Sequence, residues 1–285
     1  MDSNREIRLM SVMAHQDDFE FNASGIFSIT KKAYGDRVKL KILTSTRGAS
    51  GHHILNADET FKRRDAEARR SAEMLGAEYE CLRCLDGKHV EAQFFPDRNT
   101  LGGLWNSIRE FRPHYLFCPP LISNPLAGIH IDHYNTAIAV RMLGYQVTVP
   151  HAYPVIGEEV TERVEAPVII NVDDMYARET DWHFCVDISS VYYERKIPMS
   201  LCHESQLFEW LPWNSGVPVP SVDQVKDNLK KRHLNINRRY GMNDGVMREF
   251  FRITAWGKKT LPKDFGNLFP CSTLSDAGKK ILGEQ

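Results

Sequence analysis

The feature that most constrains the fold is an alternation of short apolar runs with longer amphipathic segments through the first half of the chain. Residues 7–14 and 38–44 are apolar runs of strand length bounded by charged residues, as in strands buried on both faces. Residues 58–76 then carry apolar side chains at helical spacing behind a capping Asp58 and end at Gly76. Such an alternation predicts a parallel β-sheet with helices packed against it.

The pattern continues with a strand at 80–85, a helix at 100–111 and a strand at 115–118. The second half is less regular and predicts strands at 147–153, 168–173 and 184–188, a helix at 190–208 interrupted at Pro198, a proline-rich loop at 211–220 and a helix at 221–241 that begins with a capping box. We therefore expect an α/β, Rossmann-like fold: a mostly parallel, doubly wound sheet with helices on both faces and an irregular C-terminal elaboration. Residues 1–210 would form the main domain, with residues 211–285 packed on it as an extension.

Composition narrows the classes of partner. Lys plus Arg (36) nearly balance Asp plus Glu (37), so the net charge of −1 gives no electrostatic basis for binding nucleic acid or an anionic membrane. The N-terminus is polar and no apolar stretch approaches the roughly 20 residues of a membrane span, which predicts a cytoplasmic protein. Six scattered cysteines, including the lone pair Cys81 and Cys84, are expected to be reduced thiols without a metal.

Two polar clusters follow strands of the predicted sheet. Residues 14–20, with the sequence AHQDDFE, come directly after the first strand, and residues 130–133, with the sequence HIDH, follow the strand at 115–118 after a loop. Active sites of open α/β sheets form at the carboxyl ends of strands, so the two clusters are expected to face one crevice.

These side chains supply the parts of a hydrolytic zinc site. Two imidazoles and one carboxylate hold zinc and leave a position open for water, although iron, cobalt or manganese also suits such a set. A second carboxylate can act as general base, and a further histidine oriented by an aspartate can stabilise an oxyanion. Each motif alone has an ordinary explanation, since Asp17 and Asp18 could cap a helix and His130 and His133 could lie on a surface. Their joint presence after predicted strands favours the site.

The two motifs resemble those of the PIG-L/LmbE-like N-acetylglucosaminyl deacetylases, which carry AHPDD and a later HxDH. Weaker agreements are the glycine-containing loop at 46–51, the RxxE pattern from Arg64, the Asp86-Gly87 pair, Lys196 and the HESQ sequence at 203–206, so the resemblance spans about residues 6–207. It implies zinc ligation by His15, Asp18 and His133, Asp17 as general base on a metal-activated water, His130 as oxyanion stabiliser and Asp132 as the residue that orients His130. Arg64, Asp86 and Arg47 are expected to contact the substrate.

Two departures from the family pattern stand out. Gln16 replaces the usual proline, which removes a restraint on φ, and only Gly25 remains of the glycine-rich stretch after Glu20. Neither change removes a catalytic group. The tryptophans Trp182, Trp210 and Trp213 are expected to serve packing, with residues 211–213 a candidate lid or subunit contact.

The expected function is therefore deacetylation of a small-molecule conjugate of N-acetylglucosamine or a similar N-acetyl amino sugar. Hydrolysis of a different N-acyl amine, in a secondary-metabolite or thiol pathway, is the alternative within the same chemistry. A non-catalytic nucleotide-binding module is disfavoured because carboxylates stand where GxGxxG would bind phosphate, and a metal-binding pseudoenzyme because base and oxyanion group are both present. Assembly into a homo-oligomer stays open.

Overall fold

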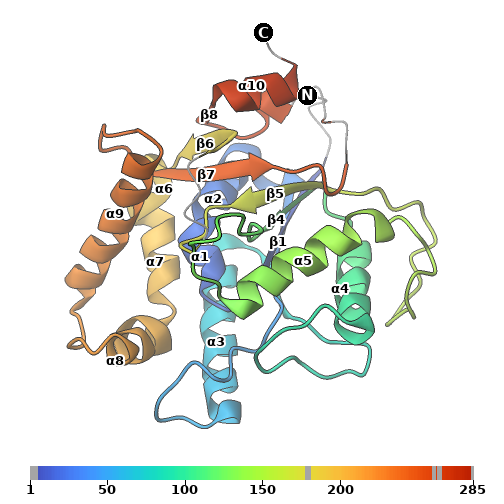
Figure 1. The fold of residues 1–285 in the computed structure, drawn as a ribbon, viewed down its shortest axis with the longest axis horizontal. Helices are drawn as coiled ribbons and strands as arrows, with labels where there is room; N and C mark the ends of the chain where they lie inside the picture. Colours follow the sequence, from blue (N-terminus) through green and yellow to red (C-terminus); the bar gives the residue numbers. More distant parts are fainter. Residues whose placement is uncertain (1–5, 177–180, 259–260, 262–264, 284–285) are drawn as a thin grey trace.

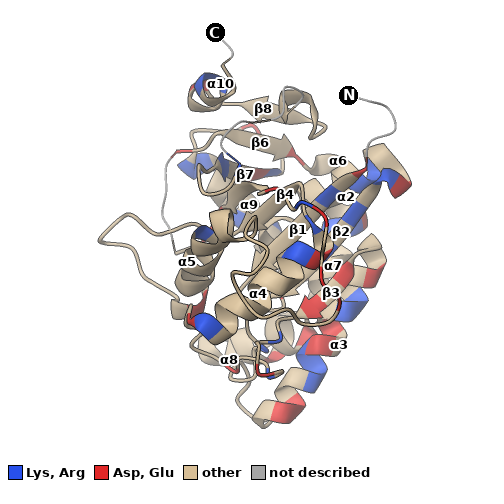
Figure 2. Cartoon of the chain, turned by 90° about the vertical axis from the view of Figure 1, so that its right-hand side faces the viewer, with Lys and Arg blue, Asp and Glu red and all other residues tan. Residues whose placement is uncertain are grey.

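One eight-stranded sheet runs through the computed structural model, which describes residues 6–176, 181–258, 261 and 265–283. Its spatial order is β3-β2-β1-β4-β5-β7-β6-β8. Figure 1 shows the strands from β1 to β8, and Figure 2 shows β2 and β3. The strands are β1 (Ile7–Met13), β2 (Val38–Thr44), β3 (Glu78–Cys81), β4 (Tyr115–Cys118), β5 (Val168–Val172), β6 (Phe184–Asp187), β7 (Arg248–Ile253) and β8 (Ser272–Leu274).

The sheet has a parallel and an antiparallel part. Strands β3, β2, β1, β4 and β5 are parallel neighbours, with Leu9 of β1 opposite both Leu40 and Tyr115. Strands β7, β6 and β8 are antiparallel to their neighbours, and β7 lies between β5 and β6. The carboxyl ends of β1, β4 and β5 therefore meet at one edge of the sheet.

Helices cover both faces of the sheet. On one face the core joins α1 (Asp18–Asn22), α2 (Ser24–Tyr34), α3 (Ala57–Leu75), α7 (Ile197–Leu201) and α9 (Val222–Arg239), and on the other it joins α4 (Arg98–Phe111) and α5 (Ile131–Gln146). Alternation along β1 serves both cores: Leu9 and Met13 point into the first, whereas Met10 and Val12 point into the second. The expected mostly parallel sheet with helices on both faces is thus confirmed.

Shorter helical segments complete the chain. They are η1 (Gly35–Arg37), α6 (Ser189–Val191), the π-helical η2 (Tyr192–Lys196) and η3 (Ser205–Trp210), α8 (Leu211–Asn214), η4 (Phe265–Asn267) and α10 (Asp276–Leu282). Charges of both signs alternate along α3, as expected of a helix with one face in solvent (Figure 2). No helix within the described ranges is both long and apolar enough to cross a membrane.

Several expected elements differ in detail. The strand at 147–153 is wrong: this segment is irregular, and Val147, Ala152 and Tyr153 pack against the second core without pairing to the sheet, because Pro150 interrupts the run. Residues 211–214 form α8 instead of a loop. Pro198 and Pro212 each lie in the first turn of a short α-helix that directly follows a π-helical segment.

Helix ends also shift by a turn or less. Asn56, not Asp58, caps α3, in a capping box with Glu59. The predicted capping box of Ser221 and Gln224 at the start of α9 is present. The six cysteines are free thiols and five are buried, Cys81 and Cys84 among them.

Candidate active site

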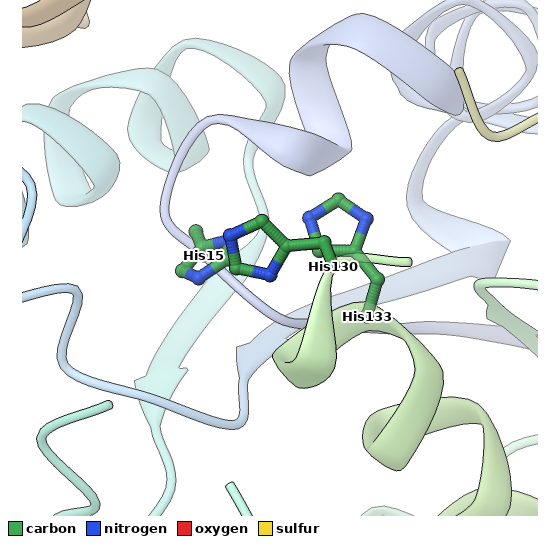
Figure 3. Close-up of side chains that lie close together, drawn as sticks. All are labelled: His15, His130 and His133. Carbon is green, nitrogen blue, oxygen red and sulfur yellow. The ribbon is translucent and has the colours of Figure 1, made fainter. Parts of the chain in front are cut away.

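The two histidine clusters meet at the carboxyl ends of β1 and β4. His15 lies in the turn between β1 and α1, whereas His130 caps α5 and His133 occupies its first turn. Ring centroids lie 4.8 Å apart for His15 and His130, 4.8 Å for His130 and His133 and 5.2 Å for His15 and His133. Figure 3 shows the three rings converging from the two segments. The two motifs therefore lie together at this edge of the sheet.

Asp18 bridges two of these histidines. Its Oδ2 accepts a hydrogen bond from the backbone N–H of His15 at 2.8 Å and lies 3.4 Å from His15 Nδ1. Its Oδ1 lies 3.3 Å from His133 Nε2. Asp18 is 8% exposed, so its carboxylate serves these two rings and does not cap α1.

Each of the two rings is held from its far side by a second carboxylate. Asp132 Oδ2 lies 3.2 Å from His15 Nε2, and Asp174 Oδ2 lies 2.6 Å from His133 Nδ1. In a metal-binding histidine, one ring nitrogen binds the metal and the opposite ring N–H commonly donates to a carboxylate. That contact fixes the tautomer in which the metal-binding nitrogen carries no proton. His15 Nδ1 and His133 Nε2 are therefore the nitrogens directed at Asp18.

The electrostatics of this cluster suit a cation. Burial alone would lower the pKa of His133, but Asp18 and Asp174 outweigh it and hold that pKa well above its usual value. Burial would raise the pKa of Asp18, and the two histidines instead keep it well below its usual value. A site that stabilises positive charge among carboxylates fits a divalent metal held by His15, Asp18 and His133.

Three histidines form an alternative set of ligands for one metal ion. Ring nitrogens of His15, His130 and His133 all lie within 4.8 Å of one another. His130 differs from the other two in its surroundings, because its Nδ1 accepts the backbone N–H of Asp132 at 3.3 Å. Burial first, and then the neighbouring histidines, lower the pKa of His130. A neutral ring with Nε2–H free to donate suits an oxyanion contact.

The Asp132 carboxylate contacts His15 and not His130, the residue that it was expected to orient. We expected its carboxylate to orient His130, but its two oxygens contact His15 Nε2 and the backbone N–H of Phe94, the latter at 2.6 Å. The first turn of α5 carries both residues, and their side chains diverge from it, so the carboxylate reaches across to the turn after β1 instead. In the structure Asp132 supports His15, and only its backbone contacts the His130 ring.

Asp17 lies beside the cluster with an arginine partner. It is 8% exposed and makes no side-chain capping bond at the start of α1. Arg64 of α3 donates to Asp17 Oδ1 at 3.2 Å and to the carbonyl of Gly48 at 3.1 Å. The structure thus brings Arg64 to the site, where it orients the carboxylate of Asp17.

The other two expected substrate contacts lie apart from the histidines. Arg47 pairs with Asp58 at 2.7 Å and with Glu91 at 3.1 Å. Asp86 is exposed and accepts the backbone N–H of Lys88 in a turn. Neither side chain contacts the histidine cluster among the residues that the structure describes.

Lys196 and His203 form a buried support behind the site. Lys196 Nζ lies 2.7 Å from Glu249 Oε1 and donates to the carbonyl of Glu20 at 2.7 Å, while His203 Nε2 lies 3.1 Å from Glu20 Oε2. Glu20 belongs to α1, the helix that begins at Asp18. These residues therefore hold the helix that carries the acidic pair at its N-terminal end.

The aromatic residues of the C-terminal half mostly pack against each other. Trp213 stacks on His53 at 4.6 Å and on Trp210 at 5.4 Å, and Trp182 meets Phe250 at 5.6 Å.

Gln16, which replaces the family proline, is buried and donates to the carbonyl of Thr46 at 3.3 Å. Its side chain therefore joins the turn after β1 to the loop after β2.

Asp174 is the site residue that the sequence reasoning missed. It stands two residues beyond β5, at the same edge of the sheet as the two motifs. The rule that identified those motifs, polar residues directly after a parallel strand, applies equally to the pair Asp173 and Asp174.

Comparison with protein families gives a match within the first half of the chain. Residues 10–143 match the PIG-L family, described as GlcNAc-PI de-N-acetylase. No curated protein matches the chain significantly.

Solved structures share the fold over most of the chain. N,N'-diacetylchitobiose deacetylase from Pyrococcus horikoshii is 17% identical with a TM-score of 0.62, covering 87% of this chain and 84% of its own. The conserved protein TT1542 from Thermus thermophilus is 22% identical with a TM-score of 0.57, covering 86% and 93%. GalB, the 4-carboxy-2-hydroxymuconate hydratase from Pseudomonas putida KT2440, is 17% identical with a TM-score of 0.60, covering 90% and 98%. Because one fold carries both a deacetylase and a hydratase, the reaction has to be argued from the site residues.

Proposed function

We propose that the protein is a metal-dependent N-deacetylase of N-acetylated amino sugars, on the premise that residues 10–143 match the PIG-L family, described as GlcNAc-PI de-N-acetylase. The observation that carries the proposal is the meeting of His15, Asp18 and His133 at one edge of the sheet, with the far nitrogen of each imidazole held by a buried carboxylate. That arrangement is typical of histidines that bind a metal.

His15 Nδ1, His133 Nε2 and Asp18 would hold the metal ion, with zinc the first candidate. A bound divalent metal supplies Lewis acidity, which polarises an amide carbonyl and makes water more acidic at neutral pH. The protein contributes the fixed ring orientations through Asp132 and Asp174, both at most 3% exposed.

The proton transfers fall to Asp17. Its carboxylate takes a proton from the water that adds to the amide carbonyl, and it returns that proton to the nitrogen as the carbon–nitrogen bond breaks. Acetate and a free amine are the products. Arg64 holds the carboxylate in place through Oδ1, which leaves Oδ2 for the proton.

His130 would stabilise the developing negative charge on the carbonyl oxygen. Its Nδ1 is occupied by the backbone N–H of Asp132, so the proton of a neutral ring resides on Nε2. One such donor is worth about 10²- to 10³-fold in rate.

The description of the matched family and a deacetylase among the similar solved structures support this substrate class. The Pyrococcus horikoshii protein acts on N,N'-diacetylchitobiose, an N-acetylated amino sugar. Arg64 would also contact substrate hydroxyl groups from its position beside Asp17. An N-acyl amine without a sugar is the alternative substrate, since the hydrolytic groups contact only the amide.

The test is release of free amine from a panel of N-acetylated amino sugars and non-sugar N-acetyl amines, measured on zinc-reconstituted protein. Asp17→Asn is expected to retain about one zinc per chain and to lose about 10²- to 10⁴-fold in turnover. Asp36→Asn, which removes a fully exposed carboxylate, is the matched control and should act as wild type.

Turnover of Asp17→Asn at the wild-type rate would refute Asp17 as the base. Release of amine from non-sugar substrates alone would replace the sugar by the alternative. If no amide in the panel is cleaved by a zinc-loaded protein, the deacetylase proposal fails.

A further inference from the structure

Asp174 has both carboxylate oxygens engaged. Oδ2 lies 2.6 Å from His133 Nδ1, and Oδ1 accepts the backbone N–H of Tyr176 at 2.8 Å. The side chain is 3% exposed and follows β5, a strand outside the family-matched residues. Its position is thus fixed from two sides, and the histidine ring in contact with it is fixed in turn.

The preceding residue, Asp173, is held by the end of α9. Arg239 forms an ion pair with Asp173 Oδ1, and the Tyr240 hydroxyl donates to the same oxygen at 2.7 Å. Asp173 is 7% exposed. Two consecutive buried aspartates are thereby attached to different partners, one to α9 and one to His133.

Two arginines of α9, Arg232 and Arg239, compensate the negative charge of the buried carboxylates in this region. Asp18 and Asp174 both contact the His133 ring, and Asp173 precedes Asp174, so these three buried carboxylates would repel each other without a compensating charge. Arg232 lies two helical turns before Arg239 on α9. It donates to Asn22 Oδ1 at 2.9 Å and is attracted by all three carboxylates. The helix thus places two positive charges beside the acidic side of the site.

We propose that Asp174 is a positioning residue that orients His133 for metal binding, and that Arg239 of α9 keeps Asp174 in place through Asp173. The inference rests on the proposed function, because it requires His133 to be a metal ligand. It assigns a role in the metal site to a helix that lies some eighty residues beyond the family-matched segment.

Zinc affinity tests the first part, measured by competition with a chromophoric chelator. Asp174→Asn keeps the size of the side chain and removes its charge, and it should weaken zinc binding about 10- to 100-fold. Asp187→Asn is a matched control: Asp187 also lies at the end of a strand and accepts a backbone N–H two residues on, from Ser189 at 2.9 Å. The control should bind zinc as wild type does.

Asp174→Glu restores a carboxylate and should recover part of the affinity, which a role in folding alone would not produce. Thermal midpoints of the metal-free proteins check that each variant is folded. Zinc binding by folded Asp174→Asn at wild-type strength would overturn the positioning role.

The second part is tested at a distance from the metal. Arg239→Ala should weaken zinc binding, whereas Arg238→Ala, an exposed neighbour on the same turn, should not. In the double variant with Asp174→Asn, the loss should be less than the product of the two single losses, because both act through one contact. Independent losses, or equal effects of the two arginines, would overturn the link to α9.

The outcomes also separate this inference from the proposed function. A wild-type chain that binds no zinc would overturn the metal site and the inference with it. A wild type that binds zinc and deacetylates, together with an Asp174→Asn that does both equally well, would overturn the inference alone.

Discussion

At the scale of single residues, His130 differs from its two neighbours in what fixes its ring. Both nitrogens of the His15 ring and both nitrogens of the His133 ring contact a carboxylate. The described contact of the His130 ring with Asp132 instead involves only the backbone N–H of Asp132. A histidine oriented by a neutral donor suits a role as hydrogen-bond donor better than as a metal ligand. The two possible donor sets can therefore be separated by substitution.

His130→Ala is expected to keep its zinc and to lose about 10²- to 10³-fold in turnover, since it removes only the proposed oxyanion donor. Asp18→Asn should lose zinc, because it removes the charge of a proposed ligand between the two remaining rings. Elemental analysis and amine release on both variants check this. Loss of zinc in His130→Ala with retention in Asp18→Asn would establish the three-histidine set instead.

Gly48 determines where Arg64 can lie. Its φ is +59°, and an added Cβ would come within 2.3 Å of Gln16 Oε1 and 2.7 Å of an Arg64 guanidinium nitrogen. Both atoms end long side chains, so they can move aside. The cost of a larger residue then falls on the orientation of Asp17 more than on stability.

Gly48→Ala should therefore lose about 10²-fold in turnover, as expected for a misplaced catalytic group. Its free energy of unfolding should fall by only about 1–2 kcal/mol from the positive φ. Gly76→Ala is the control, with φ +71° and its nearest contact 3.9 Å away. It should show the same loss of stability and full activity; equal turnover of both variants would contradict the argument.

The sequence predicted the residues of the cluster better than their pairing. Residue types and position after a strand suffice to bring His15, Asp18, His130 and His133 together. Which carboxylate holds which ring depends on the directions of side chains leaving α5 and on a loop after β5. That is why Asp132 was assigned to His130 and Asp174 was missed, since such contacts join residues 117 and 41 positions apart.

At the scale of elements, predictability follows the strength of the local pattern. The strands at 38–44 and 115–118 match β2 and β4 because apolar runs bounded by polar residues leave few alternatives. Residues 189–214 instead form short α-helical and π-helical pieces, and the first π-helical piece ends at Lys196, whose buried ammonium contacts Glu249. Strands β7 and β8 were not expected, because an antiparallel strand added late takes its register from tertiary contacts.

Helix α9 carries a histidine in its buried row, with Val225, Leu229, His233 and Asn237 at four-residue spacing. Burial first, and then the charge of Lys196, keep the pKa of His233 well below its usual value. The folded chain therefore keeps His233 neutral, while the unfolded chain takes up a proton near pH 6.5. Stability from this group is full above that pH and is lost as the pH falls.

The expected loss is about 1.4 kcal/mol of unfolding free energy between pH 7.5 and 5.5. His233→Gln should remove that part of the pH dependence, and His151→Gln, at a residue whose side chain is 81% exposed, should retain it. Urea unfolding of metal-free protein at the two pH values measures the difference, since the site histidines contribute equally to both variants. An unchanged slope in His233→Gln would count against a neutral His233.

At the scale of the whole molecule, one sheet unites the family-matched segment with the C-terminal portion. Strand β7 pairs with β5 through Ile170 and Ile253 and with β6 through Phe184 and Phe251. Phe251 also lies 5.6 Å from Phe117 of β4, ring to ring. The elaboration at 211–285 thus supplies a central strand, two arginines beside the site and the Glu249 partner of Lys196.

A chain ending at residue 210 should therefore fail to fold. It would leave one edge of β5 and both edges of β6 unpaired. It would also expose the aromatic core around Phe184 and bury Lys196 without its carboxylate, a loss of about 3–5 kcal/mol by itself. A chain ending at residue 275 keeps all eight strands and, of the elements that the structure describes, loses only α10, so it should stay folded. Thermal unfolding followed by circular dichroism distinguishes them: a cooperative transition is expected for the longer chain and none for the shorter. If residues 1–210 unfold cooperatively near the midpoint of the full chain, then β7 is an addition to an already stable domain, and the support that α9 gives to the metal site would be an addition as well.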